Sequence, residues 1–405
     1  MLFVCGFFFR FAPATMASSI QQELGLSVVM LGLVASMHFW AYTLAQVPAG
    51  VLADGLGVRS TALLGGTVTI VGAVLFALAT DLTALLVGCG LMGLGLAAVF
   101  SGLMRYNAVC FPANQHARVV GVTMLLAAAG SIAAEGPTAL LLTALPWRTL
   151  ILATAGVALI AVLLLVQFCR HPPTQLPGRN HSANSGLPGM GKVMGERQVW
   201  LLLLCVGGTN GTLYAFVGLW AVPMMTDGFA IPHTQAAWYP TVTLAIYGVG
   251  SLCSGWLADR LQARKPLIVA AAALSVVAWG AMACANWRPG WGALTLFVLL
   301  GLSGAQVAVI FSATRESVAL SHVGVATALV NMGAFLFAAL VQAGFGALLE
   351  AAAQIAGDGQ LELPHYRLAL LLPLGISLMG LAAAMKLQES AHGHALTWLR
   401  ANARR

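Results

Sequence analysis

Long apolar runs follow one another along almost the whole chain and are separated by short polar segments. Each run is about 20 residues long, which is the length at which an α-helix crosses the hydrocarbon core of a bilayer. The apolar residues are continuous rather than alternating, so the pattern argues against a β-barrel. We expect membrane-spanning helices at residues 1–19, 29–52, 62–80, 83–105, 119–143, 149–169, 199–222, 236–257, 266–285, 291–312, 323–349 and 367–387.

A polar segment between the sixth and seventh runs divides the chain into two halves. Residues 171–198 are rich in Pro, Gly, Ser and Asn, a composition typical of a flexible surface linker. The expected domains are an N-terminal six-helix bundle at 1–170, this linker at 171–198, a C-terminal six-helix bundle at 199–388 and a basic tail at 389–405.

The composition agrees with a fold that lies mostly in lipid. Hydrophobic residues make up 60% of the chain and charged residues 8%, whereas a soluble domain carries about 25% charged residues. The seven cysteines stand singly, which fits packing residues better than a metal site or a disulfide framework. We therefore expect an all-α membrane protein without a metal or another cofactor.

The basic residues indicate how the chain lies in the membrane. If both termini face the cytoplasm, fifteen of the 19 Lys and Arg residues fall on that side, and only Arg148, Arg288 and Arg367 fall on the other. Cytoplasmic loops carry an excess of Lys and Arg. The net charge of +7 is thus a topology signal of an inner-membrane protein with cytoplasmic termini, and we expect no nucleic-acid partner.

One polar motif occurs in both halves, each time after the second apolar run. It reads Gly-x-Leu-Ala-Asp, with an Arg five positions after the Asp. A motif repeated at the same place in two halves indicates an internal duplication. The residues concerned are Gly50, Asp54 and Arg59 in the first copy and Gly255, Asp259 and Arg264 in the second.

The two motifs resemble the signature loop of the major facilitator superfamily, which lies between helices 2 and 3 and reads roughly Gly-x-Leu-Ala-Asp-Arg-x-Gly-Arg-Lys. The first copy departs from it at Gly55 and Ser60, and the second at Gln262. The resemblance implies twelve helices in two pseudo-symmetric six-helix bundles. It also implies that the motif residues form a latch, which joins the halves on the cytoplasmic side in the outward-facing state. The alternative interpretation is that the charges of these residues only anchor the two loops at the lipid headgroups.

Arg10 is the one Lys or Arg residue deep inside an apolar run, in the sequence Phe-Phe-Phe-Arg-Phe-Ala-Pro. A cation at the bilayer centre costs about 3 kcal/mol or more unless it faces a cavity or a partner. The arrangement resembles the first helix of superfamily members that move organic anions, which implies contact with a substrate carboxylate or phosphate. The alternative is a structural Arg paired with an acidic neighbour.

Glu135 is the one acidic residue deep inside a run. A desolvated carboxyl group can bind and release a proton near neutral pH, which makes Glu135 a candidate for proton coupling. Glu135 could instead neutralise Arg10, form a fixed salt bridge or reach toward the outer surface. The following Gly136-Pro137 pair resembles the helix 5 motif of drug/proton antiporters, without the flanking glycines of that motif.

Uncharged polar residues inside the runs are candidates for substrate binding. In the second run three of them are spaced by four and share one helix face, and the seventh run has two spaced by four within a glycine-rich stretch. Taken singly, each is also suited to hydrogen bonding between helices. The candidates are His38, Tyr42, Gln46, Asn210, Tyr214 and Asn331.

These features together predict a secondary active transporter that works by alternating access as a monomer. It would move a small organic anion or metabolite with a proton across the inner membrane. A proton-coupled exporter of drugs or metabolites is the alternative within transport. An intramembrane enzyme or a transporter-like sensor fits less well, because the sequence has no His-Glu-x-x-His cluster, no Walker motif and no added soluble domain.

The charge distribution yields a topology prediction. Cysteines introduced by Ser182→Cys, in the linker, and by Asp358→Cys, between the last two runs, are expected to react with a membrane-impermeant thiol reagent from opposite sides. In intact cells only the Asp358→Cys protein should be labelled, and permeabilised cells should show both. Labelling of both residues in intact cells would contradict the two-bundle topology.

Overall fold

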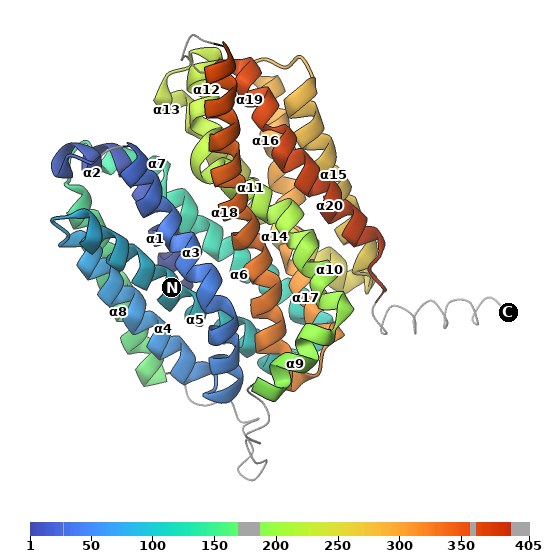
Figure 1. Ribbon diagram of the computed structural model, residues 1–405. Helices are drawn as coiled ribbons and strands as arrows, with labels where there is room; N and C mark the ends of the chain where they lie inside the picture. Colours follow the sequence, from blue (N-terminus) through green and yellow to red (C-terminus); the bar gives the residue numbers. More distant parts are fainter. Residues whose placement is uncertain (27, 169–186, 357–361, 390–405) are drawn as a thin grey trace.

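The computed structural model describes residues 1–26, 28–168, 187–356 and 362–389, and these residues are almost entirely helical (Figure 1). The N-terminal half, blue to green in Figure 1, contains α1 (Leu2–Thr15), α2 (Ala17–Leu24), α3 (Val28–Gly55), α4 (Val58–Ala77), α5 (Leu82–Cys110), α6 (Ala113–Ala134), α7 (Gly136–Leu141) and α8 (Trp147–Phe168).

The C-terminal half, green to red, lies beside it. It begins with α9 (Leu187–Gly195) and a long seventh helix made of α10 (Arg197–Val206), η2 (Gly207–Gly211), α11 (Thr212–Ala215), η3 (Phe216–Trp220) and α12 (Ala221–Phe229). There follow α13 (His233–Ala236), α14 (Trp238–Leu261), α15 (Lys265–Cys284), α16 (Trp291–Gly304), α17 (Val307–Ser317), η4 (Leu320–His322), α18 (Val323–Ala356), α19 (Leu363–Ala369) and α20 (Leu371–Met385).

The helices account for the twelve predicted spans. Ten helical stretches of the described chain are long and apolar enough to cross a membrane. The other two spans are α3, with 28 residues, and α1, a shorter apolar helix that α2 follows directly. The protein is therefore an all-α membrane protein with two six-helix bundles, as the sequence predicts.

Several predicted spans are interrupted. The run at 119–143 bends at Glu135, where the backbone leaves the helical region with φ −98° and ψ −95°. Pro137 lies at the start of α7, where its missing N–H removes no helical hydrogen bond. The run at 291–312 is divided between α16 and α17 at Ala305 and Gln306.

The glycine-rich seventh helix is not broken but locally widened. Its segments η2 and η3 are π-helical, and such segments are frequent at functional sites. Glycine is required here for close packing. A Cβ atom on Gly211 would lie 2.7 Å from Phe337 Cβ of α18, and one on Gly208 would lie 2.8 Å from Gly380 Cα of α20. The segment η2 therefore fits tightly between these two helices.

The two bundles meet along two pairs of helices, α3 with α18 and α6 with α14. We call the end at which α3, α8 and α14 finish the linker end, and the end that carries α2, α7, α12 and α19 the far end (Figure 1). Gly50 lies at the interface near the linker end, where a Cβ atom would come within 2.8 Å of Ala328 Cβ. Gly255 packs in a corresponding way on the backbone of Ala117 in α6.

The predicted linker and tail are covered only in part. Residues 171–186 and 390–405 lie outside the described chain, whereas 187–195 form the helix α9, which contacts α10 and α18. The predicted domain boundaries remain a prediction.

At the far end, a small polar cluster fixes α2 to α8. Trp147 Nε1 and Arg148 Nε donate to the two carboxylate oxygens of Glu23 at 2.6 and 3.0 Å. These hydrogen bonds lower the pKa of the Glu23 carboxyl below its ordinary value. All three residues belong to the N-terminal bundle, so this cluster does not join the two halves.

Candidate functional site

Arg10 lies in α1 at the interface between the bundles and is only 3% exposed. Three aromatic rings surround its guanidinium carbon, which is 4.3 Å from the ring centroids of Phe7 and Phe335 and 4.9 Å from that of Tyr42. None of its three guanidinium nitrogens has a hydrogen-bond partner among the described residues. Three aromatic rings therefore enclose this cation.

The charge of Arg10 is also without a counter-ion. The ion pairs of the described chain involve Arg105, Arg148 and Arg264, and none includes Arg10. A cation–π contact contributes about 0.5–2 kcal/mol, and each buried unsatisfied donor costs about 1–3 kcal/mol. Five N–H groups thus remain available to a ligand that carries oxygen acceptors.

Phe335 of α18 is the centre of the aromatic cluster around Arg10. Its ring centroid is 4.3 Å from that of Tyr42 and 6.1 Å from that of Phe39, both in α3. On the other side it stacks on Tyr214 of the seventh helix at 5.8 Å. The cluster therefore spans both bundles, and α18 supplies the ring at its middle.

The predicted polar face of α3 points into the same region. Tyr42 accepts a hydrogen bond from Asn331 Nδ2 of α18 at 3.0 Å, which joins the two bundles. His38 stacks on the Tyr42 ring, and neither nitrogen of its imidazole has a hydrogen-bond partner among the described residues. The same holds for both amide atoms of Gln46, one turn further along α3. Unpartnered polar groups thus line α3 beside Arg10.

The two candidates on the seventh helix have different surroundings. Asn210 donates to the Gly304 carbonyl at 3.0 Å and lies 3.2 Å from the Thr209 hydroxyl, so the C-terminal bundle satisfies both ends of its amide. The hydroxyl of Tyr214 is 2.8 Å from that of Tyr247. Tyr214 therefore belongs to the aromatic cluster at the interface, whereas Asn210 lies within its own bundle.

Glu135 does not neutralise Arg10 in this structure. Its half-buried carboxylate lies at the bend between α6 and α7, and Thr241 Oγ1 of α14 is 3.4 Å from Glu135 Oε2. Thr241 belongs to the other bundle, so this weak contact crosses the interface toward the far end. Arg10 and Glu135 thus have separate environments.

At the linker end, Asp54 joins α3 to the first turn of α18. Its carboxylate accepts hydrogen bonds from the backbone N–H of Gly324 at 3.2 Å and of Val325 at 2.9 Å, and it forms an ion pair with Arg105 of α5. A carboxylate at a helix N-terminus is favoured by the free N–H groups and by the helix dipole. Arg59 does not take part, since it donates to the Val166 carbonyl in its own bundle at 2.8 Å.

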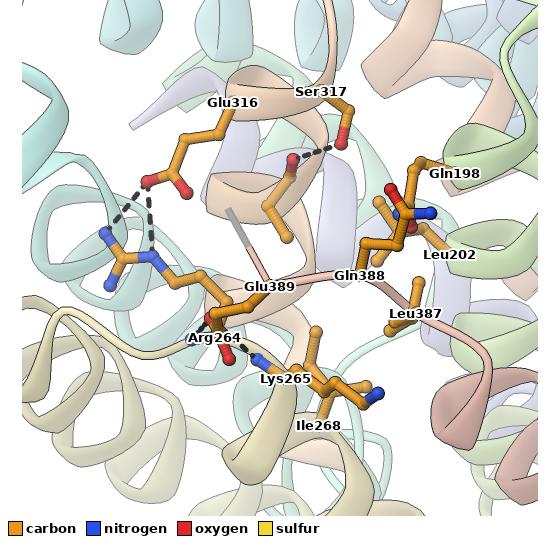
Figure 2. Close-up of a pocket in the computed structure, with 11 residues that line it drawn as sticks. Gln198, Leu202, Arg264, Lys265, Ile268, Glu316, Ser317, Leu387, Gln388 and Glu389 are labelled. Carbon is orange, nitrogen blue, oxygen red and sulfur yellow. Dashed lines mark hydrogen bonds and ion pairs between the residues drawn. The ribbon is translucent and has the colours of Figure 1, made fainter. Parts of the chain in front are cut away.

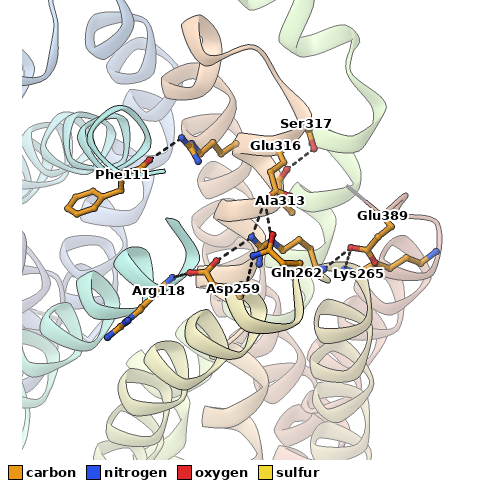
Figure 3. Close-up of polar contacts among 11 residues, drawn as sticks. Phe111, Arg118, Asp259, Gln262, Lys265, Ala313, Glu316, Ser317 and Glu389 are labelled. Carbon is orange, nitrogen blue, oxygen red and sulfur yellow. Dashed lines mark hydrogen bonds and ion pairs between the residues drawn. The ribbon is translucent and has the colours of Figure 1, made fainter. Parts of the chain in front are cut away.

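The second motif makes a similar connection in the opposite direction. Asp259 at the end of α14 accepts a hydrogen bond from the backbone N–H of Arg118 in α6 at 2.7 Å (Figure 3). Arg264 pairs with Asp259 at 3.3 Å and with Glu316 of α17 at 3.1 Å. Each motif Asp therefore contacts the backbone of the other bundle, and the linker end is closed.

A pocket of about 160 Å³ lies next to Arg264 at the linker end of the C-terminal bundle (Figure 2). Glu389, just after the last helix, lines this pocket. Its carboxylate accepts hydrogen bonds from the backbone N–H of Arg264 at 2.7 Å and of Lys265 at 3.4 Å. Glu389 thus caps α15 from a distant part of the chain.

Several residues of these sites are absent from the sequence predictions of function, among them Phe7, Phe335, Arg105 and Arg315. Phe7 and Phe335 carry no signal that separates them from other aromatic residues in apolar runs. Arg105 stands at the end of an apolar run, where its position alone does not separate a functional residue from one that only marks the end of the helix. Arg315 of α17 donates to the carbonyls of Ala108 at 2.8 Å and Phe111 at 3.1 Å and so crosses the interface, a contact that needs the tertiary structure to be seen.

Comparison with known proteins identifies relatives that cover two thirds or more of the chain. The chain is 21% identical to the uncharacterized transporter YybO of Bacillus subtilis (strain 168), with 84% of this chain and 83% of YybO covered. It is 28% identical to a D-galactonate transporter of Escherichia coli O6:H1 (66% and 69% covered) and 25% identical to the L-fucose-proton symporter of Escherichia coli K12 (68% and 70% covered).

Solved structures share the fold. The E. coli fucose:proton symporter FucP superimposes with a TM-score of 0.71 at 19% identity, over 95% of this chain and 98% of that chain. A bacterial homolog of the human lysosomal transporter Spinster gives 0.67 at 15% identity, over 95% of both chains. The family model of the Major Facilitator Superfamily matches residues 1–343 and 202–396. The chain therefore belongs to the Major Facilitator Superfamily, and it is a transporter rather than an enzyme.

Proposed function

We propose that the protein is a proton-coupled secondary transporter that moves a small organic anion by alternating access. The observation that carries the proposal is Arg10, a buried cation between the bundles with neither a counter-ion nor a hydrogen-bond acceptor among the described residues. A carboxylate would supply both, with two parallel hydrogen bonds to the guanidinium. The same cation disfavours cationic drugs as substrates.

The substrate carries a single negative charge and several hydroxyl groups. Arg10 is the one Lys or Arg residue deep inside an apolar run, so a second anionic group would remain unpaired. His38 and Gln46 each offer a donor and an acceptor, which suits hydroxyl groups. Tyr42, Asn331 and Tyr214 complete the site. The name of one relative, a D-galactonate transporter, agrees with such a hydroxylated monocarboxylate.

Glu135 is the candidate for the coupling proton. Its carboxyl group lies at a helix bend on the bundle interface, contacts Thr241 and has no ion pair among the described residues, so protonation breaks none there. Binding and release of a proton there changes the charge at an interface that opens and closes during transport. Asn210 has a supporting role, because its hydrogen bonds hold the widened seventh helix against Gly304.

Asp54 and Asp259 form the latch between the bundles, with Gly50 and Gly255 providing close approach. The excess of basic residues supports a cytoplasmic linker end and cytoplasmic termini in an inner membrane. The state seen here, with the linker end closed, is then outward-facing or occluded. The protein acts as a monomer, in which the linker connects two bundles that move against each other.

Arg10→Lys is expected to weaken the binding of D-galactonate roughly ten- to a hundredfold, because an ammonium group cannot reproduce the bidentate geometry of a guanidinium. Isothermal titration of the purified protein measures this loss. Arg148→Lys is the matched control, since Arg148 pairs with Glu23 at the far end, and its affinity should stay at the wild-type value. Equal affinities of the Arg10→Lys and wild-type proteins would contradict a role of Arg10 in anion binding.

Glu135→Gln is expected to abolish proton-driven accumulation of D-galactonate in proteoliposomes and to spare exchange, because exchange needs no net proton movement. Uptake against a gradient and counterflow are measured on the same preparation. Glu23→Gln, a change at an exposed carboxylate, serves as the control. If the double change Arg10→Gln with Glu135→Gln restored concentrative uptake, the two residues would merely neutralise each other and both proposed roles would be wrong.

Asp54→Asn is expected to shift the protein toward states with an open linker end. Loss of the charge-assisted contacts, about 1.5–3 kcal/mol, corresponds to a shift of roughly ten- to a hundredfold. The rate of thiol labelling at Ala328→Cys, which is fully buried at the closed interface, reports the opening. Asp81→Asn changes a helix cap outside the interface and should leave the rate unchanged. An unaltered rate in Asp54→Asn would leave only the headgroup-anchor role.

A further inference from the structure

The two rings closest to Arg10 belong to different bundles. Phe7 and Phe335 both have centroids 4.3 Å from the guanidinium carbon. Phe7 lies one turn before Arg10 in α1, whereas Phe335 lies in α18 of the C-terminal bundle. When the bundles move during transport, Phe7 travels with Arg10, but the contact with Phe335 depends on how the bundles are placed. The Arg10–Phe7 contact is therefore kept when the bundles move, whereas the Arg10–Phe335 contact can be lost.

We propose that Phe335 is a positioning residue that takes the place of the substrate anion in the empty transporter. Its ring stabilises the Arg10 cation across the bundle interface and thereby favours the state with a closed linker end. This inference rests on the proposed function in one respect, namely that an anion is the group whose place the ring takes. Without the ring, the Arg10 cation would lose its contact with the C-terminal bundle in this state.

The position of Phe335 in α18 supports this coupling. The first turn of the same helix receives the Asp54 carboxylate at Gly324 and Val325. Phe335 lies ten residues after Val325, about 15 Å along a rigid helix. Asn331, one turn before Phe335, donates to Tyr42. A displacement of α18 from α3 thus breaks the latch, the Asn331 contact and the Arg10–Phe335 contact together.

The flanking rings keep Phe335 in place over Arg10. Tyr42 and Tyr214 lie against it from the two bundles at 4.3 and 5.8 Å between centroids, and its side chain is 2% exposed. A side chain packed in this way has little freedom to leave the guanidinium while the interface is closed. An anion that enters the site would engage the N–H groups at the edge of the guanidinium and make the ring contact dispensable.

The test measures the conformation of the protein without substrate. Spin labels at Leu56→Cys and Leu320→Cys, two exposed residues at the linker end of different bundles, give the ratio of closed to open states from pulsed-EPR distances. The background replaces Cys110, Cys169, Cys253 and Cys284 with Ser. Phe335→Leu is expected to lower the ratio about tenfold, within the range of a desolvated cation–π contact. Phe335→Trp, which keeps an aromatic face, should stay near the wild-type ratio.

Phe7→Leu is the matched control, because it removes a ring at the same distance that moves with Arg10, and its ratio should be unchanged. Equal shifts in Phe7→Leu and Phe335→Leu would mean general loosening and would overturn the proposal, as would no shift in Phe335→Leu. The melting temperature of each variant excludes a folding defect as the cause.

A double-mutant cycle separates the cation contact from packing alone. In an Arg10→Gln background, Phe335→Leu is expected to have no further effect on the ratio, since the charge is gone. A full tenfold effect in that background would assign the role to packing against Tyr42 and Tyr214 instead. The cycle needs no substrate, so its failure is distinct from a failure of D-galactonate to bind, which would count against the proposed function only.

Discussion

A guanidinium held between two helix bundles by aromatic rings, without a carboxylate, is the feature on which the arrangement of this interface depends. In lipid, polar groups have to be satisfied inside the protein, so they gather where helices face one another. Here they gather around Arg10, and the side chains of His38 and Gln46 beside it have no hydrogen-bond partner in the part of the chain that the structure describes. The protein accepts a locally unfavourable arrangement, which the binding of an anion would relieve under the proposed function.

The linker end is built on the opposite principle, because the two motif aspartates there are both paired with an arginine. Asp54 and Asp259 each accept backbone hydrogen bonds from the other bundle and pair with an arginine of their own. These contacts are charge-assisted hydrogen bonds and ion pairs between polar groups, and they do not depend on the packing of apolar side chains. They can therefore separate without disturbing the bundle cores. The internal duplication explains why this contact occurs twice. In one copy the aspartate belongs to the N-terminal bundle and the backbone N–H to the C-terminal bundle, and in the other copy the reverse holds.

The fold could be predicted from the sequence because run length, hydropathy and the repeated motif are local features. Helix periodicity also placed His38, Tyr42 and Gln46 on one face. The pairing of Asp54 with Arg105 could not be predicted in this way. Both motifs have an arginine five residues after the aspartate, but α4 starts at Val58 and carries Arg59 inside its first turn toward α8, whereas α15 starts only after Arg264. A difference of a few residues in where a helix begins thus changes which arginine meets the carboxylate.

The contact between Arg10 and the Phe335 ring could not be predicted either, since it joins residues more than 300 positions apart in sequence. The cap that Glu389 forms on α15 is another such long-range contact, and it affects where the chain can be fused to another protein. Glu389 follows the last helix almost immediately, yet its carboxylate occupies the backbone N–H groups of Arg264 and Lys265. The residues just after α20 are therefore a structural part of the C-terminal bundle. A fusion partner or affinity tag joined before residue 389 would uncap α15 beside the Asp259 motif, whereas one joined after the tail leaves that cap intact.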